Sequence, residues 1–232
     1  MHLIPRAVPW NHALTWYEDA MRLWKRAPAM WALLAVLTLA SEFATQAIPE
    51  VGSVVSKLVA PLVACGLLYA SVAADRGTRP VPMHAIAAFR AGGGAIAAII
   101  TASLITFGAE AFAAWWIADA NLLANDSASA DLSGTAIAGV YAIGVLASLP
   151  LTFVPIHVLF EHVPVSAAFN ASWSAFVQNT APLLVYGAAS LVLLGFGVVT
   201  MGLGLILVLP LWAASSYAAW KDIFDVRDPP VI

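Results

Sequence analysis

The sequence predicts an all-α, polytopic membrane protein with about six transmembrane helices and amphipathic helices at the membrane surface. The 232-residue chain is 62% hydrophobic and only 10% charged, whereas a soluble domain carries about 25% charged residues. Its apolar residues form runs of the length that a membrane crossing requires, about 20 residues. Its ten Lys and Arg residues fall almost entirely on one side of these runs, as the positive-inside rule predicts for a multi-pass protein.

The positions of the apolar runs give the predicted spans, all within a single membrane domain of residues 1–232. The last apolar stretch, residues 181–220, is about twice as long as one crossing needs, and a glycine-rich segment at 195–204 divides it into two. The predicted spans are residues 28–48, 51–74, 94–117, 135–160, 181–198 and 202–220.

The distribution of positive charge predicts that both termini are cytoplasmic. An even number of spans places the two termini on one side of the membrane. Nine of the ten Lys and Arg residues lie before the first span, between the second and third, or after the last. Lys57 is the exception, and the opposite loop at 118–134 contains aspartates but no positive residue. This bias is the signature of a cytoplasmic side.

Residues 11–27 predict an amphipathic helix that lies along the membrane surface and does not cross it. Leu14, Tyr17, Met21 and Trp24 share one face of this helix, and charged residues populate the other. Aromatic and basic residues in this pattern suit the headgroup boundary. The alternative is that the apolar face packs on the rest of the protein, and the two interpretations are compatible.

Two further segments suggest an internal repeat. Residues 82–91 and 164–181 each resemble a short surface helix that precedes a pair of spans, as residues 11–27 do. Pro61 and Tyr69 in the first unit are echoed by Pro210 and Tyr217 in the third. The hypothesis is a chain of three units, each with one surface helix and two spans.

Three ionisable residues inside the predicted spans are candidates for an ion or proton site: Glu42, Lys57 and Glu110. A helical rise of ~1.5 Å per residue places all three at a similar depth, in the third of the bilayer opposite the termini. Burying an unpaired charge there is costly, so we expect Lys57 to lie close to one carboxylate. The other would be protonated, hydrated or bonded to a neighbour such as Gln46. The alternative is a purely structural ion pair, or side chains that reach the headgroups.

A weaker candidate is a metal site formed by His157, Glu161 and His162. Residues four apart share a helix face, but the spacing matches neither the HExxH nor the HxxEH pattern of metalloproteases. Polar residues at the end of a span, in contact with water, are the alternative interpretation. The single cysteine, Cys65, excludes an intrachain disulfide and a cysteine-based zinc cluster.

Several functional classes lack their sequence signatures in this chain. There is no GxSxG elbow, no P-loop and no GxGxxG after a strand, so the chain is predicted not to be an enzyme and to need no cofactor. The net charge of −3 provides no basic surface for nucleic acid.

The order of several short motifs is similar to that of a known family. They are the segments 6–9 (RAVP), 23–31 (LWKRAPAMW), 75–77 (DRG), 89–90 (FR), 202–204 (GLG), 208–210 (VLP) and 216–224 (SYAAWKDIF). Together they resemble a family of six-helix inner-membrane proteins of proteobacteria with no assigned activity, which is distantly similar to the membrane domain of glycerophosphodiester phosphodiesterases. The resemblance implies a bacterial inner (plasma) membrane, and it assigns no catalytic residue.

Two functional hypotheses follow from the sequence. The first is a non-enzymatic membrane subunit or scaffold whose partners are the lipid bilayer and a membrane protein or a second copy of the chain. The second is a small permease or channel-like protein that uses Glu42, Lys57 and Glu110. A water-filled cavity that reaches these residues would favour the permease, and a dry interior packed with small residues would favour the scaffold.

Overall fold

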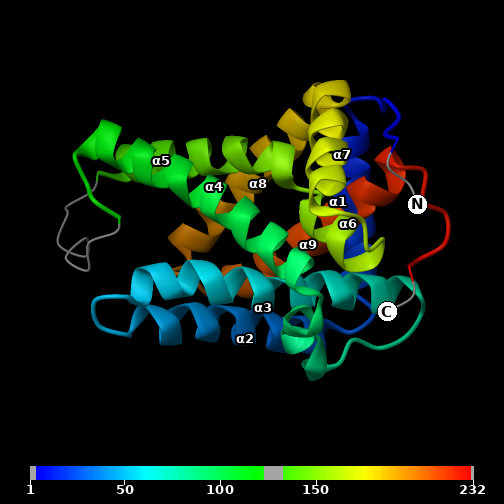
Figure 1. The fold of residues 1–232 in the computed structure, drawn as a ribbon, viewed down its shortest axis with the longest axis horizontal. Helices are drawn as coiled ribbons and strands as arrows, with labels where there is room; N and C mark the ends of the chain where they lie inside the picture. The colour runs from blue at the N-terminus through cyan, green and yellow to red at the C-terminus, as the bar shows by residue number, and fades with distance from the viewer. Residues whose placement is uncertain (1–3, 123–132, 231–232) are drawn as a thin grey trace.

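The computed structural model describes residues 4–122 and 133–230, and this part of the chain contains helices and no strand. Part of the acidic loop predicted at 118–134 therefore lies outside the described residues. Figure 1 shows the arrangement of the elements. In chain order they are α1 (His12–Trp24), α2 (Pro28–Gln46), α3 (Gly52–Asp75), η1 (Pro82–Arg90), α4 (Gly93–Ala118), α5 (Gly134–Ser148), η3 (Leu149–Leu151), α6 (Val154–Phe160), α7 (Val165–Gln178), α8 (Thr180–Val199) and α9 (Leu205–Ile223).

Five helical segments of the described chain are long and apolar enough to cross a membrane. They are α2, α3, α4, α8 and the path Gly134–Phe160, and they match the first five predicted spans closely. The sixth predicted span, 202–220, corresponds to α9. Helix α9 is not among the five apolar segments. Its C-terminal half carries Ser215, Ser216, Lys221 and Asp222, and these polar residues lower its mean hydropathy.

The predicted span 135–160 is not one continuous helix. After α5 the chain forms the short 3-10 turn η3 and then starts again as α6. Pro150 lies in η3, and Pro155 lies in the first turn of α6. Because proline has no backbone N–H and its ring clashes with the preceding turn, it disrupts the hydrogen bonding of a continuous helix.

The long helices follow one another in three pairs, α2 with α3, α4 with α5, and α8 with α9, and α3 is the most buried of the five apolar segments. Within the apolar window of α3, 61% is buried, against 17% for α4. Gly66 permits one of the close contacts, since a Cβ there would stand 2.6 Å from the carbonyl oxygen of His84. The absence of a side chain therefore lets η1 pack directly on α3.

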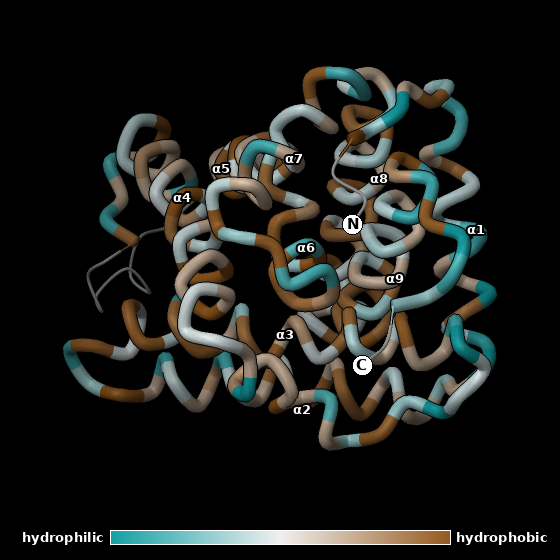
Figure 2. The backbone as a smooth tube through the Cα atoms, turned by 45° about the vertical axis from the view of Figure 1, so that its right-hand side comes forward, coloured by the Kyte–Doolittle hydropathy of each residue, from teal (hydrophilic) through white to brown (hydrophobic). Residues whose placement is uncertain are grey.

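One end of the bundle, here called the terminal end, carries α1, η1, α7 and both ends of the chain. Figure 1 shows α1 and α7 standing across the direction of α2 and α3 at this end. The opposite end, here called the far end, carries the turns 47–51 and 200–204, the end of α4 and the start of α5. Hydrophilic residues are frequent along α1 in Figure 2.

The structure corrects the predicted apolar face of α1. The residues in full contact with the protein are Ala13, Trp16, Ala20 and Leu23, whereas Leu14 is 53% exposed. Tyr17, Met21 and Trp24 are partly buried at the edge of this face. Alanines let α1 approach α9 closely, and the Trp16 indole donates a hydrogen bond to Asp222 Oδ2 over 2.9 Å. Packing on the rest of the protein therefore decides how α1 is turned.

Most of the hydrophobic core lies at the terminal end. Its largest fully buried side chains come from α1, from the start of α2, from the α5–α6 junction and from the end of α9. They include Trp16, Trp31, Phe153, Tyr217 and Trp220. Towards the far end, α4 and α5 share a separate cluster of small residues, Ala113, Ala114, Ala120 and Val140. Cys65 is buried in α3, as expected of a small packing residue.

Candidate functional site

The structure brings together two of the three charged residues predicted within the spans. Glu42 near the end of α2 and Lys57 near the start of α3 form an ion pair with an Nζ–Oε1 distance of 3.2 Å. Their side chains are 25% and 26% exposed. The Gln46 amide also donates to Glu42 Oε1. The prediction that Lys57 lies close to a carboxylate is confirmed.

Helix α4 covers this ion pair from the side. The Lys57 ammonium lies 5.1 Å from the ring centroid of Phe107, a distance at which a cation is attracted to an aromatic face. Glu110 lies on the same helix, three residues after Phe107. The three predicted residues therefore lie at the far end and are called here the Glu42–Lys57–Glu110 cluster.

Glu110 differs from Glu42 because, within residues 4–122 and 133–230, it forms no recorded ion pair or hydrogen bond. Its side chain packs against α5 at Gly144, where a Cβ would stand 2.7 Å from Glu110 Cγ. The glycine makes room for the carboxylate between α4 and α5. Glu110 is therefore the unpaired acid of the cluster. Whether the cluster binds an ion stays a prediction.

A second polar group, which the sequence analysis missed, lies at the terminal end around Asp222 of α9. Its carboxylate accepts from Arg6 Nη2 and His12 Nδ1, both over 2.7 Å, and from the Trp16 indole. Asp222 lies beyond the predicted span 202–220. Partial burial of its carboxyl acts to raise its pKa, but the hydrogen bonds from Trp16, His12 and Arg6 outweigh burial and hold the pKa below its usual value.

Asp75, at the end of α3, is the centre of a neighbouring group. Its Oδ2 accepts from the Tyr217 hydroxyl over 3.0 Å and from the Lys221 ammonium over 2.6 Å. Tyr217 and Lys221 are four residues apart on α9 and therefore share a face. That spacing was the one sequence signal for this group, but it does not identify the partner on α3.

The segment before α1 is fixed across the same end. Its backbone bonds to the chain's last helix through Arg6 N and Ile223 O over 2.8 Å. The Asn179 side chain, buried between α7 and α8, accepts from Val8 N over 2.8 Å and donates to Arg6 O over 3.0 Å. Arg6, Asn179 and Ile223 thus connect three parts of the chain that are distant in sequence.

The predicted metal residues are only partly brought together. His157 and Glu161 are both buried, and His157 Nδ1 lies 2.5 Å from Glu161 Oε2. His162 is exposed, with a left-handed backbone φ of 51° that turns the chain away from α6. In the part of the chain that the structure describes, no three His, Cys, Asp or Glu residues are grouped to hold a metal ion.

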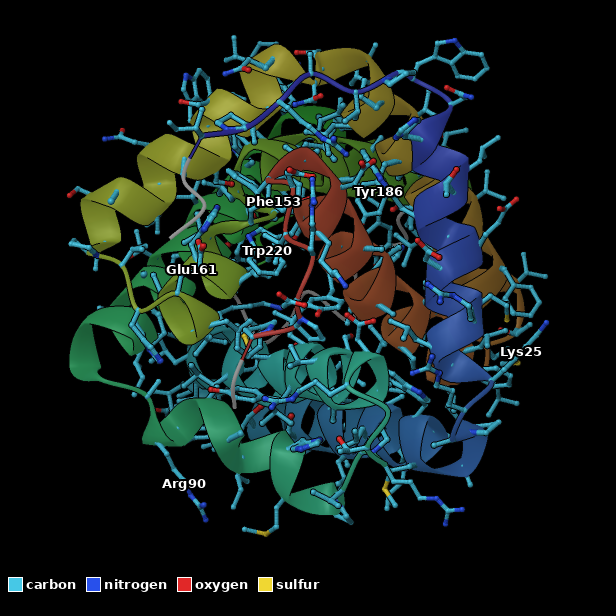
Figure 3. All side chains as sticks on the ribbon, turned by 90° about the vertical axis from the view of Figure 1, so that its right-hand side faces the viewer. Lys25, Arg90, Phe153, Glu161, Tyr186 and Trp220 are labelled. Carbon is cyan, nitrogen blue, oxygen red and sulfur yellow. The ribbon has the colours of Figure 1, made fainter. Side chains whose placement is uncertain are left out.

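Aromatic rings surround this buried pair. The His157 ring meets Phe224 edge-on with centroids 4.6 Å apart, and Trp220 with centroids 6.4 Å apart. Figure 3 shows Trp220 in the interior between α6 and α9, with Glu161 beside it. The His157–Glu161 bond therefore lies within α6 and its C-terminal cap, and the ring contacts of His157 connect α6 to the end of α9.

Two cavities lie at the terminal end, beside α1. One, of about 340 Å³, lies between α1 and α9 and includes Asp75, Lys221 and Asp222 in its lining. The other, of about 680 Å³, is lined by Tyr17, Glu18, Met21, Arg22, Lys25 and Arg26. Neither includes a residue of the Glu42–Lys57–Glu110 cluster in its lining.

No protein-family model matches the chain, and comparison with curated proteins and with solved structures finds no significant match. The functional proposal therefore depends on the geometry of this chain.

Proposed function

We propose that this chain is a non-enzymatic subunit or scaffold of a bacterial inner membrane, with six spans and cytoplasmic termini, that binds another membrane protein or a second copy of itself. Five apolar helices support the membrane assignment. In this proposal α9 is the sixth span, because it returns from the far end to the end where both termini lie (Figure 1).

The distribution of aromatic and basic residues supports this orientation. Phe112, Trp115 and Trp116 form an exposed aromatic group at the far end of α4, and tryptophan is enriched where a membrane meets water. Nine of the ten Lys and Arg residues belong to the sequence before α2, between α3 and α4, or after the predicted sixth span. Basic residues concentrate on the cytoplasmic side of a membrane.

The order of the elements also fits the three-unit hypothesis. A surface helix precedes each pair of long helices: α1 before α2 and α3, η1 before α4 and α5, and α7 before α8 and α9. The units are unequal, since η1 is a 3-10 helix and the α5–α6 path is interrupted. In this proposal the repeats have diverged to serve different contacts.

The observation that carries the scaffold proposal is open space at glycines on exposed faces of the apolar helices. Gly108 in α4 and Gly195 in α8 are both exposed, and nothing lies within 4 Å of where their side chains would begin. In lipid, helices associate where small residues allow close backbone approach. The open spaces at Gly108 and Gly195 would allow the helices of a partner to approach closely.

Photo-crosslinking in native membranes tests this proposal. A photoreactive residue at Leu104, exposed one turn from Gly108 on α4, should give a discrete protein adduct, and Gly108→Leu should reduce that adduct at least fivefold. The matched control is a photoreactive residue at Val36, exposed on α2. Lipid adducts alone at Leu104, or an adduct that Gly108→Leu leaves unchanged, would contradict the scaffold proposal.

The unpaired Glu110 favours a second candidate function, a small permease or channel-like protein. A membrane-embedded carboxylate without an ion-pair partner, beside the charge of Lys57, is the feature expected of a proton or cation site. Proteoliposomes that contain the chain should then show cation or proton flux, and Glu110→Gln should abolish it. Equal flux in both proteins, or none in either, would remove this candidate.

A further inference from the structure

The larger cavity at the terminal end lies beside the C-terminal half of α1, at the elbow where the chain turns into α2. Its lining contains three cations, Arg22, Lys25 and Arg26, and one acid, Glu18. The Glu42–Lys57–Glu110 cluster, at the far end, has no residue in this lining. The scaffold proposal likewise makes no use of the cavity.

Each of the three cations is held differently. Arg22 Nη2 bonds Asp19 Oδ1 over 2.8 Å, and the Arg26 guanidinium donates to the carbonyl oxygen of Ala74 near the end of α3. Lys25 is exposed and takes part in no ion pair among the described residues. Figure 3 shows its side chain pointing away from the body of the molecule. Two guanidinium groups held by the protein and one free ammonium that points outward therefore lie beside a single open hollow.

This combination suits a phosphate group. A guanidinium presents a planar set of N–H donors that matches phosphate oxygens, and an ammonium adds a compact charge. Even with Glu18 in the lining, positive charge is in excess. An anion with several acceptor oxygens satisfies these donors better than a single carboxylate does.

The apolar residues beside the three cations indicate that the phosphate belongs to a lipid. Tyr17 and Met21 give the cavity an apolar wall. The Tyr17 hydroxyl lies 2.8 Å from the Ser190 hydroxyl, and this hydrogen bond holds α1 against the middle of α8. Pro28 begins the apolar helix α2 two residues after Arg26, and Leu33 is exposed on it. An acyl chain attached to a phosphate at the elbow would therefore lie against an apolar helix.

We infer that the elbow between α1 and α2 binds the phosphate group of an anionic phospholipid through Arg22, Lys25 and Arg26. This inference requires that the chain spans the membrane as proposed, but it does not depend on partner binding. A free inorganic phosphate would gain only the polar contacts and none of the apolar wall.

Binding of single lipids to the purified full-length chain in detergent, followed by native mass spectrometry, tests the inference. The probes are phosphatidylglycerol, phosphatidylcholine and inorganic phosphate. The double variant Arg22→Gln/Lys25→Gln should retain phosphatidylglycerol at least fivefold less than the unmodified chain, the effect expected of a cation at an anionic lipid. The matched control is Arg79→Gln/Arg90→Gln, which removes two exposed arginines from the same end of the molecule and should change retention less than twofold.

Three outcomes would overturn the inference: equal loss in the two double variants, equal retention of phosphatidylcholine and phosphatidylglycerol, or inorganic phosphate that competes at the concentration of the lipid. Thermal unfolding of each variant in the same detergent verifies that a loss of lipid is not a loss of fold. Lys25→Arg should keep lipid retention within twofold. A chain that fails the crosslinking test for a partner but binds this lipid would refute the scaffold proposal alone.

Discussion

The carboxylates at the two ends of the bundle differ in their hydrogen-bond and ion-pair partners. At the terminal end, the carboxylates of Asp75 and Asp222 each accept hydrogen bonds from at least two side chains of other helices or of the N-terminal segment. At the far end, Glu42 has Lys57 and Gln46, and Glu110 has no recorded ion-pair partner within the described chain. The first arrangement fixes helices relative to one another, whereas the second leaves one titratable group uncommitted.

The packing follows the same division. The terminal end is built around large aromatic side chains such as Trp16, Trp31 and Trp220, and the cluster between α4 and α5 is built from alanines and one valine. Large buried side chains contribute more to stability, since each removes more apolar surface from water. The terminal end is therefore expected to hold most of the stability that does not depend on lipid, and mutations there should have the larger effects.

The largest expected effect concerns which end faces the cytoplasm. Reporter fusions after residue 80, at the terminal end, and after residue 126, in the loop that lies outside the described residues, should give opposite signals. The nine-to-one charge bias predicts that residue 80 is cytoplasmic and residue 126 is not. A cytoplasmic signal at residue 126 would reject the six-span arrangement.

Asp222→Ala should destabilise the chain by about 2–3 kcal/mol, because Arg6, His12 and Trp16 lose their common acceptor and hydrogen bonds that involve charged groups contribute about this much. The measurement is thermal unfolding in a fixed detergent. Asp225→Ala is the matched control, since Asp225 is 55% exposed and lies 3.6 Å from Arg6. Its effect should stay under about 1 kcal/mol, as for an exposed ion pair. Equal losses would show that the hydrogen-bonded group around Asp222 stabilises the chain no more than an exposed ion pair does.

Lys57→Met should cost less, about 1–2 kcal/mol, because Glu42 keeps its bond to Gln46 and is partly exposed. The double variant Lys57→Met/Glu42→Gln removes both charges and should recover most of this loss, since an unpaired charge is worse than none. Thermal unfolding of the two single variants and the double variant gives the coupling between the residues. Purely additive effects would mean that the ion pair does not stabilise the far end.

The smallest expected effect is a loss of folding stability at acid pH, caused by protonation of Asp222 at the terminal end. The pKa of Asp222 is lower in the folded chain than its usual value of about 3.8, so its ionised form contributes stability above about pH 4. That contribution is lost as the pH falls below this value and through the lower pKa of the folded state. Unfolding temperatures measured from pH 6 to pH 3 should therefore fall less steeply in Asp222→Asn. Parallel curves would assign the acid sensitivity to other carboxylates.

The apolar helices, and the position of the charged cluster at one end of them, could be predicted from the sequence because both depend on local properties. Hydropathy and a rise of ~1.5 Å per residue suffice to place Glu42, Lys57 and Glu110 at one end. The break at Pro150 and Pro155 could also have been anticipated, since proline disrupts helices. The rotation of α1 about its own axis could not be predicted from the sequence. Two apolar faces that differ by one residue are nearly equivalent until the packing partner, α9, is known.

The terminal polar groups were beyond the reach of sequence patterns for a similar reason. Asp222 and His12 are 210 positions apart in the sequence, and no periodicity connects them. His162 shows the opposite error. Its spacing suggested a ligand beside His157, but a left-handed φ of 51° at that position separates it from the helix. Contacts between residues that are distant in sequence depend on the whole fold, and local patterns in a single sequence do not predict them.

The bond between Arg6 N and Ile223 O sets an order of events during synthesis. Arg6 leaves the ribosome long before its partners at positions 179, 222 and 223 are made, because at least 173 positions separate it from each of them. At about 5–20 residues per second, the N-terminal segment waits roughly 10–40 seconds for them. During that interval Trp16 and His12 lack their hydrogen-bond acceptor, Asp222. The apolar face of α1 must then be covered by something other than α9. Because α1 is amphipathic, it can bind to the membrane surface during this interval and then pack on α9 once that helix has been made.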